Sequence, residues 1–390
     1  METIFECKAG ELLNAIQSVS KAIDQRAKAP IMRNILVEAS ADGTARLTAS
    51  GASVQLGRSV RLGTKANTEI TFNPQLVSSY LKTYPADTNI KLLLNDEKKI
   101  VVQAGRNRSS HVSLPAQDFL QMTAFGAASE PVTVAAEVLR KLLAQTVFCA
   151  ADKDARAFLN GVCLEIEGDN IRAVSTDGHR MALSSATLPG VNAPKTSVII
   201  PKDVAVSILK ILTDGVKGKK APQETEASVS IQFSLTQAMF SFEDFNIRTL
   251  LLSGKFPDYD RLFPKNNLVL VEVCAADLEN VLNAADAIRT DNRVLGITLS
   301  TNSTDELSLF AKNSEKEEYE STVPAQIQGG TVSCGYNIKY LKEVMHLFGK
   351  DDVCAMSFPS ATSSNETLSL MRKTADGLDS FQYVVMPMRV

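Results

Sequence analysis

Long apolar runs are missing from this sequence of 390 residues, although 44% of its residues are hydrophobic. No segment approaches the roughly 20 consecutive apolar residues that a membrane-spanning helix needs. The first ten residues, METIFECKAG, lack the basic start and apolar core of a secretory signal peptide, so we expect no such signal. These absences indicate a globular protein of the cytoplasm with no membrane partner.

Clustered metal ligands are also missing. The six cysteines are scattered, with no pair at CxxC spacing and no histidine at ligand spacing. The only three histidines, His111, His179 and His346, are far apart in the sequence. We therefore expect no metal site and no disulfide framework, and the cysteines are typical of small core residues in a reducing cytoplasm.

An excess of basic residues is missing as well. The chain has 41 lysines and arginines against 44 aspartates and glutamates, which gives a net charge of −3. Tight nonspecific binding of nucleic acid is therefore not expected from the total charge. A basic face on an acidic body remains compatible with these numbers.

Signatures of common enzymes are absent, because no GxSxG, HExxH, GxxxxGK[ST] or GxGxxG sequence occurs. One segment, VSTDGHRMALSS at residues 174–185, does gather Asp177, His179 and Arg180. Asp177-Gly178 between two apolar runs is typical of a hairpin turn, since glycine tolerates positive φ. No second carboxylate or histidine stands at a spacing suited to metal binding. We expect a turn that presents side chains to a partner, with no catalytic residue and no cofactor.

What the sequence does contain is a threefold internal repeat of helices and strands. Helical periodicity of apolar residues recurs in residues 10–23, 136–148 and 276–288. Each segment is followed by an alternating hairpin pattern, in residues 35–50, 161–175 and 296–311. A second helical segment then begins near residues 73, 201 and 337, with Asn73 and Asn337 as expected N-caps and Pro74 at the first helical position.

More alternating strands follow the second helical segment of every unit. The pattern therefore predicts an α+β fold of three similar domains, each made of two strand-and-helix halves. We place the domains at residues 1–128, 129–264 and 265–390. Residues 215–228 are expected to form an exposed loop within the second domain.

Three segments carry a resemblance to a known family: FLNGVCLEIEGDNIRAVSTDGHRMAL, GKFPDYDRLFP and the terminal YVVMPMRV. With the three-unit layout, they resemble the bacterial DNA sliding clamps, the β subunits of DNA polymerase III, over the full length. The resemblance implies a non-catalytic processivity factor of the bacterial replication fork. It implies two protomers joined head to tail in a ring around duplex DNA, with helices lining the inside and sheets outside.

The resemblance also implies partners. These are the α subunit of DNA polymerase III, the ATP-driven clamp loader complex, and other polymerases and repair proteins that carry clamp-binding peptides. A clamp must slide, so its contacts with DNA should be few, because each neutralised phosphate strengthens nonspecific binding.

Cations on and just after the repeated helices are the candidates for contact with DNA. At one family position that touches DNA, Ala157 replaces a residue that is often aromatic. Separately, Glu279 and Asp286 make the basic stripe uneven on the first helix of the third domain. The expected DNA-binding residues are Arg26, Lys82, Lys153, Arg156, Phe158, Lys210 and Lys339.

The family assigns the Asp177–Arg180 turn to a groove between the second and third domains, where partners insert a short apolar peptide. Three methionines there, Met181, Met386 and Met388, offer an adaptable wall, and Arg180 and Arg389 are expected to hold carbonyls or acidic residues at the rim. Met181 and Val390 stand where relatives usually have leucine. The matching positions are Leu159, Thr176, Gly178, His179, Arg180, Met181, Pro257, Arg261, Leu262, Val384, Val385, Met386, Pro387, Met388 and Arg389.

On the residues alone, the C-terminal tail is equally well explained as a closing strand, and the resemblance favours a binding site. Two other functions also remain open at this point. One is an adaptor that binds peptides without encircling DNA, and the other is an enzyme built on Asp177 and His179.

The expected ring seam joins residues 105–115 to residues 287–294 of a second copy. Ser109, His111 and Arg289 fall where many relatives carry apolar residues. Arg106 and Arg108 are expected to meet an acidic run that ends at Glu320, which predicts a polar and salt-sensitive dimer. The expected interface residues are Arg106, Arg108, Ser109, His111, Ile288, Arg289, Glu315, Glu317 and Glu318.

Overall fold

The computed structural model describes residues 2–64, 66–218, 227–263, 269–290, 295–301, 303–358, 367–374 and 377–389. Val390, residues 291–294 of the expected seam and most of the expected loop at 215–228 lie outside the described residues. The chain divides into two compact units, one of Met1–Arg140 with Val206–Leu251 and one of Lys141–Ala205 with Leu252–Val390. The two boundaries between the three predicted domains stay predictions.

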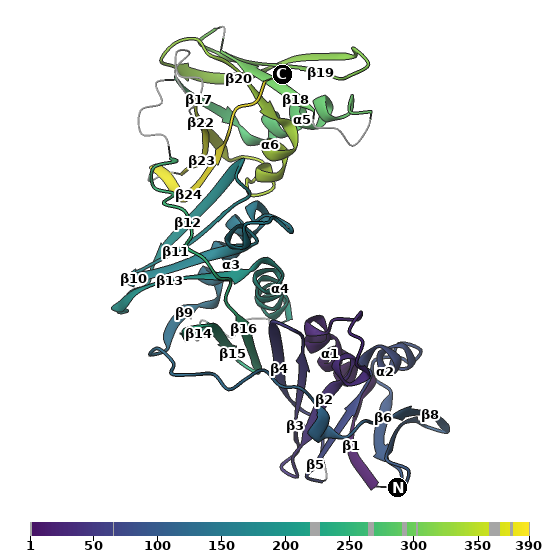
Figure 1. Cartoon of the computed structure of the whole chain (residues 1–390). Helices are drawn as coiled ribbons and strands as arrows, with labels where there is room; N and C mark the ends of the chain where they lie inside the picture. Colours follow the sequence, from purple (N-terminus) through teal and green to yellow (C-terminus); the bar gives the residue numbers. More distant parts are fainter. Residues whose placement is uncertain are drawn as a thin grey trace. The chain divides into compact units, whose positions relative to one another are not determined.

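One order of elements, strand–helix–strand–strand–strand, occurs six times in the part of the chain that the structure describes (Figure 1). The first two copies are β1 (Glu2–Lys8), α1 (Ala9–Val19), β2 (Ile35–Ala39), β3 (Thr44–Ser50) and β4 (Val54–Arg61), then β5 (Thr68–Phe72), α2 (Pro74–Leu81), β6 (Asn89–Leu94), β7 (Lys99–Ala104) and β8 (Asn107–Val112). The predicted division of each domain into two halves is confirmed.

The middle two copies begin at β9. They are β9 (Val132–Ala135), α3 (Ala136–Thr146), β10 (Gly161–Gly168), β11 (Asn170–Thr176) and β12 (Arg180–Thr187), then β13 (Ala193–Pro201), α4 (Lys202–Gly218), β14 (Ser228–Phe233), β15 (Gln237–Phe242) and β16 (Phe245–Leu250).

The last two copies begin at β17. They are β17 (Val269–Cys274), α5 (Ala275–Asp286), β18 (Gly296–Ser300), β19 (Glu306–Lys312) and β20 (Glu318–Gln328), then β21 (Ser333–Asn337), α6 (Ile338–Met345), β22 (Val353–Phe358), β23 (Leu368–Thr374) and β24 (Gly377–Val385). Short 3₁₀ turns occur at Ser20–Ala22, Pro30–Arg33, Ala116–Asp118, Val147–Cys149 and Ala157–Leu159.

The helices form where the sequence predicts them, because their apolar residues recur on one face, and α2 and α6 also carry a start signal. On α1, Leu12, Ile16 and Val19 are buried, which is the spacing of one helical face. The Asn73 side chain accepts hydrogen bonds from the backbone of the first turn of α2, and Asn337 caps α6 in the same way. Both predicted caps are confirmed.

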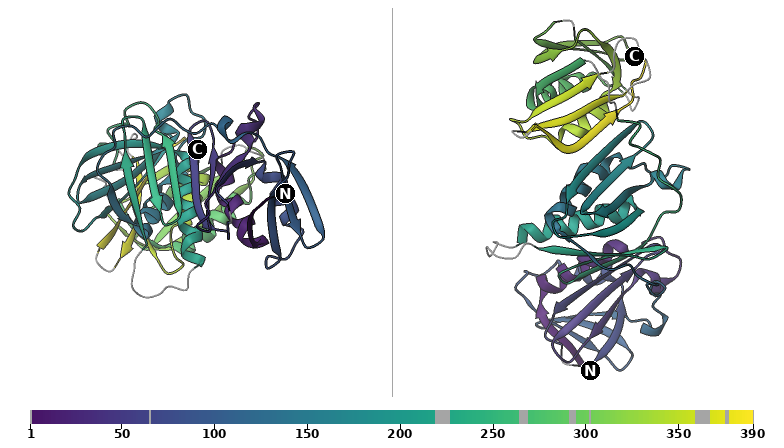
Figure 2. Two further views of the ribbon diagram at one scale, coloured as in Figure 1. Left: turned by 90° about the horizontal axis from the view of Figure 1, so that it is seen from below. Right: turned by 90° about the vertical axis from the view of Figure 1, so that its left-hand side faces the viewer.

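Within the described ranges the strands form three antiparallel sheets. Four strands follow the order β1-β6-β7-β8 and eight follow β5-β2-β3-β4-β16-β15-β14-β9, both in the first unit. In the second unit twelve strands follow β13-β10-β11-β12-β24-β23-β22-β17-β20-β19-β18-β21. The C-terminal strands, yellow in the right-hand view of Figure 2, lie in front of a green helix that packs behind them.

A regular pairing joins halves that are distant in the sequence. The last strand of a first half, β4, pairs with β16, the last strand of a second half, and β12 pairs with β24 in the same way. Two other strands also come last in their halves: β8 ends the second half of the first domain, and β20 ends the first half of the third domain. Within the described part of the chain β8 pairs only with β7, and the beginning of β20, Glu318–Pro324, pairs only with β19.

The core of the second unit lies between its helices and its sheet. Large side chains fill it, with Tyr336, Phe358 and Tyr383 fully buried and the Tyr336 and Phe358 rings in edge contact at 6.3 Å between centroids. A smaller apolar cluster includes Met181, Phe256, Tyr259 and Val384. This second cluster underlies the candidate functional site.

Candidate functional site

An apolar groove of about 170 Å³ lies in the second unit, over the start of β12 and the end of β24. Its wall comes from five stretches of chain: the turn before β10, the β11–β12 turn with the start of β12, the loop after β16, the residue before β23 and the end of β24. The lining residues are Arg156, Phe158, Leu159, Thr176, Gly178, His179, Arg180, Met181, Phe256, Pro257, Tyr259, Leu262, Thr367, Val384 and Met386.

The β11–β12 turn is held in shape by its own side chains. Asp177 Oδ1 accepts hydrogen bonds from the backbone N–H groups of His179, at 2.9 Å, and Arg180, at 3.1 Å. The Thr176 hydroxyl accepts from the Gly178 N–H at 3.0 Å and donates to the Arg180 carbonyl at 2.6 Å. Asp177 therefore acts as a turn former, the part that Asp commonly takes in such turns.

The C-terminal strand lies beside this turn. Met181 pairs with Val384 across the two strands, and the Met386 N–H continues the contact by donating to the His179 carbonyl at 2.8 Å. Alternate residues of a strand face opposite sides of the sheet, so Val384 joins the groove cluster while Val385 joins the main core. The Met386 side chain is 46% exposed at the mouth of the groove.

The loop after β16 closes the remaining side. Phe256 and Tyr259 are buried with their rings in edge contact, and the Tyr259 hydroxyl donates to the Glu165 carboxylate. Burial, reinforced by this hydrogen bond, raises the pKa of Tyr259 above its usual range. The hydroxyl is therefore a fixed donor that anchors the loop. Leu262, farther along the same loop, is 45% exposed over the groove.

Arg180 lies beneath the turn and away from the expected rim position. Its side chain is only 7% exposed, and its guanidinium donates to Asp177, Glu343 and the Phe148 carbonyl. The cation at the mouth is Arg156, whose side chain is 55% exposed and whose Nη2 lies 3.1 Å from the place a Cβ would take on Gly178.

Arg156 is tied to Asp154 by a hydrogen bond of 3.0 Å between Nε and Oδ1. Hydrogen bonds from Arg156 lower the pKa of Asp154 to about 2, so this carboxylate stays charged in neutral solution. Arg156 and Phe158 were expected to contact DNA, and both line the groove.

The structure thus gathers most of the residues that the sequence predicts for the groove. Arg261 is exposed outside the lining and is paired with Asp258 at 2.9 Å, and Pro387, Met388 and Arg389 continue the chain beyond the lining residue Met386. The Met388 N–H donates to the Gly335 carbonyl, which holds this tail against β21. Sequence reasoning missed Phe256, Tyr259 and Thr367, although the first two stand inside the GKFPDYDRLFP segment.

The other expected DNA-binding residues are exposed at the surface. Lys82 caps the C-terminal end of α2, Lys210 lies on α4, and Lys339 lies in the first turn of α6. Arg26 and Lys153 lie in loops after the 3₁₀ turns Ser20–Ala22 and Val147–Cys149, respectively. Each is therefore free of a buried structural role.

The expected seam residues occupy β8 in the first unit and the α5 and β19–β20 ends in the second. On β8, Ser109 Oγ lies 2.9 Å from His111 Nε2, and burial lowers the pKa of His111 below its ordinary 6.5. In the second unit the Asn313 side chain donates to the Ile288 carbonyl and to the Glu317 carboxylate.

The three remaining seam residues of the second unit have local contacts. Arg289 pairs with Asp286, Glu318 pairs with Lys312, and the Glu315 N–H donates to the Asn313 side chain at 2.9 Å. Because the Asn313 side chain contacts both Ile288 and Glu317, the acidic β19–β20 turn lies next to the end of α5.

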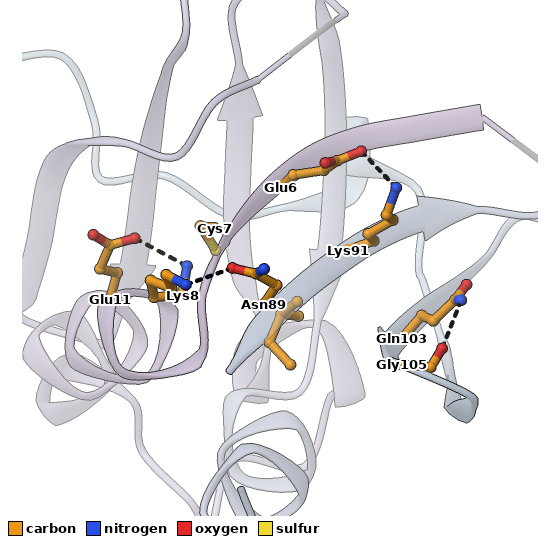
Figure 3. Close-up of a pocket in the computed structure, with 9 residues that line it drawn as sticks. Glu6, Cys7, Lys8, Glu11, Asn89, Lys91, Gln103 and Gly105 are labelled. Atoms are coloured by element: carbon orange, nitrogen blue, oxygen red, sulfur yellow. Dashed lines mark hydrogen bonds and ion pairs between the residues drawn. The ribbon is translucent and has the colours of Figure 1, made fainter. Parts of the chain in front are cut away.

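A larger cavity, of about 730 Å³, lies in the first unit and has a different chemistry (Figure 3). Its polar side chains already have partners: Lys91 pairs with Glu6 at 2.9 Å, and Lys8 Nζ donates to Asn89 at 2.6 Å. Binding sites are usually mainly apolar with a few free polar groups, so the apolar groove is the better candidate.

Neither a metal cluster nor a membrane helix accompanies the groove. Among the described residues, no three His, Cys, Asp or Glu side chains gather as metal ligands. None of the helices in the described ranges is both long and apolar enough to cross a membrane.

Comparison with known proteins gives one result over the whole chain. Family models of the DNA polymerase III beta subunit match its N-terminal domain at residues 3–123, its central domain at 133–258 and its C-terminal domain at 260–389. The Beta sliding clamp of Pseudomonas putida is 30% identical over 99% of this chain and 100% of its own length. The Beta sliding clamp of Escherichia coli K12 is 29% identical over the same shares.

Solved structures give the same result. A DnaN sliding clamp from Pseudomonas aeruginosa, bound to griselimycin, superposes with a TM-score of 0.89 at 29% identity and covers 100% of both chains. The Caulobacter crescentus clamp, at 22% identity and a TM-score of 0.86, shares the fold over 100% of both chains.

Proposed function

This chain belongs to the beta sliding clamp family, and we propose that its apolar groove receives short peptides from the proteins that it tethers to DNA. It is a DNA sliding clamp, a processivity factor and not an enzyme. The enzymatic alternative built on Asp177 and His179 is therefore wrong, in line with the use of Asp177 as a turn former.

The observation that carries the peptide proposal is the half-exposed apolar wall of the groove. Leu262 is 45% and Met386 46% exposed in the free protein, over buried Met181 and Val384. An incoming apolar side chain would remove this surface from water, and this burial would stabilise the complex by roughly 25 cal/mol for each Å² of apolar surface. Flexible methionines adapt to more than one ligand shape, which suits a site shared by several partners.

The groove also offers polar groups to orient a peptide. Arg156 stands at the mouth with its charge partly exposed, and His179 belongs to the lining. We assign to Arg156 the rim role first expected of Arg180: holding a backbone carbonyl or an acidic side chain.

The strand pairing within the chain supports a proposal for how the ring closes. β4 pairs with β16 and β12 with β24, which leaves β8 and the first half of β20 as the corresponding strands. We propose that these two strands pair between protomers, at both ends of a head-to-tail dimer. Edge strands present unpaired backbone groups that another strand can satisfy. This pairing brings Arg106 and Arg108 to the acidic run from Glu315 to Glu320, and Ser109 and His111 lie in the same seam.

The proposal for DNA is that the exposed cations contact phosphates inside the ring. These are Arg26, Lys82, Lys153, Lys210 and Lys339. With a net charge of −3 the protein holds DNA by encircling it, since few phosphate contacts leave it free to slide. The domain boundaries at 128/129 and 264/265 are supported by strands β9 and β17, which start a repeat just after each.

The proposed partners are the α subunit of DNA polymerase III, the clamp loader complex, and other polymerases and repair proteins that carry clamp-binding peptides. All would compete for the one groove on each protomer. The proposed location is the bacterial cytoplasm at replication forks.

The test of the groove is a chain that ends at Val385, together with the point variant Met386→Ala. Binding of a fluorescent apolar peptide with clamp-binding sequence is measured by anisotropy. We expect the truncation to abolish binding and Met386→Ala to weaken it about tenfold, because an anchoring apolar contact at the mouth is lost.

The matched control is Leu235→Ala, which removes an apolar side chain that is 96% exposed on the β14–β15 turn of the first unit. This variant should bind the peptide as the wild type does, and all variants should remain dimers. Unchanged binding by the truncated chain would remove the groove from the account.

A further inference from the structure

Arg180 is enclosed on every side by groups of the second unit. Its Nε donates to Asp177 Oδ2 at 3.0 Å, Nη1 to Glu343 Oε2 at 2.5 Å and Nη2 to the Phe148 carbonyl at 3.2 Å. The guanidinium carbon lies 4.4 Å from the centroid of the Tyr340 ring, in a cation–π arrangement. This side chain is therefore fixed by its surroundings and is poorly placed to reach out to a ligand.

The same guanidinium holds the wall of the groove through Asp177. One oxygen of the Asp177 carboxylate accepts from Arg180, and the other caps the backbone of His179 and Arg180. A shift of the guanidinium therefore moves Asp177, and with it the turn that carries His179 and Gly178 into the groove.

Glu343 is the far end of this chain of contacts. It lies on α6, 163 residues after Arg180, and it is not among the residues that line the groove. Its helix is anchored by Leu341, Val344 and Met345 in the core, and by a 3.0 Å hydrogen bond from the Tyr383 hydroxyl to the Tyr340 carbonyl. Glu343 thus presents a carboxylate to Arg180 from a rigid base.

We propose, on the premise that the groove binds peptides, that Glu343 is a positioning residue that sets peptide affinity by orienting Arg180 and the Asp177 turn. Two carboxylates share one buried cation, and each fixes one end of the guanidinium. Without the Glu343 carboxylate the guanidinium loses one of its two charged acceptors, and Asp177 is the one that remains. Weakening a charged hydrogen bond of a buried cation is costly, so the turn relaxes away from its binding position.

The protonation of Arg180 is consistent with this arrangement. Burial disfavours its charge, but interactions with Tyr383, Cys149 and Glu343 outweigh burial, and the pKa of Arg180 lies above its ordinary value. The cation is therefore permanent, and the position of its partners decides where it points.

Glu279 on α5 provides a control of the same residue type. Its side chain is exposed and lies outside the groove lining. Glu279→Gln removes the same charge from the second unit without touching Arg180.

The experiment compares Glu343→Gln with Glu279→Gln in the full-length dimer, with binding of the same fluorescent apolar peptide as the readout. We expect Glu343→Gln to weaken peptide binding about fivefold, because a neutral amide oxygen replaces the charged acceptor of Nη1. Glu279→Gln should leave peptide affinity unchanged. Melting temperatures check that each variant is folded.

A double-mutant cycle separates positioning from general loosening of the fold. In an Arg180→Gln background, Glu343→Gln should change peptide affinity less than twofold, because the residue acts only through Arg180. Equal affinity of Glu343→Gln and the wild type would overturn the inference, as would the same loss in both backgrounds. A wild type that does not bind the peptide would refute the proposed function instead.

Discussion

Gly178 shows how much of the groove depends on one residue. Its φ is +90°, a conformation that L side chains rarely adopt, and a Cβ there would stand 3.1 Å from Arg156 Nη2. Two features therefore depend on the absence of a side chain at this position. One is the turn that presents His179, and the other is the placement of Arg156 at the rim.

Gly178→Ala is accordingly expected to cost roughly 1–2 kcal/mol of stability and to weaken peptide binding. The measurements are the urea midpoint and the peptide anisotropy titration. The matched control is Gly168→Ala in the β10–β11 turn, where φ is +62° and a Cβ meets nothing within 4 Å. The control should lose stability but keep full peptide affinity, and parallel loss of affinity in both variants would contradict the account.

The sequence predicted which segments form the groove better than it predicted the role of each residue in it. The three segments that resemble the family contain nearly all of its wall. The roles of Arg180 and Arg156 could not be assigned from the sequence, because both are arginines and only the fold buries one and exposes the other. A buried guanidinium needs several acceptors, and these come from Phe148 and Glu343, which are distant in the sequence.

At the scale of elements, periodicity predicted the helices, the hairpins and the repeat. Asp42-Gly43 and Gly168 form turns as expected, with both glycines at positive φ. Pairing between distant halves could not be predicted, because β4 and β16 are separated by almost 190 residues and their alternating patterns fit many partners. The strands left over by that pairing, β8 and β20, are the basis of the proposed seam.

The seam is tested by a charge exchange between β8 and β20. Arg108→Glu places a like charge opposite the Glu315–Glu320 run and should weaken the dimer about tenfold, measured by sedimentation at low salt. Adding Glu318→Arg should restore much of the dimer, because opposite charges face each other again. The expected loss in Arg108→Glu shrinks at high salt, where exposed charges are screened. A dimer indifferent to both changes would place the seam elsewhere.

At the scale of the whole molecule, the central claim is that the grip on DNA is topological. Three domains per chain, a mildly acidic total charge and surface cations spread over several elements together describe a protein that encircles a duplex and does not adhere to it. The total charge gave no reason to expect tight nonspecific binding, but composition could not indicate a closed ring, since closure depends on which strand edges remain unpaired.

The most direct measurement is retention on DNA of different topology. The protein is placed on a nicked circular plasmid by a clamp loader, and the bound fraction is followed by gel filtration in about 0.5 M salt, which suppresses phosphate contacts. The account predicts that the protein stays on the circle, leaves when a restriction enzyme linearises it, and stays again when both ends are blocked by bound protein. Equal loss from circular and linear DNA would contradict it.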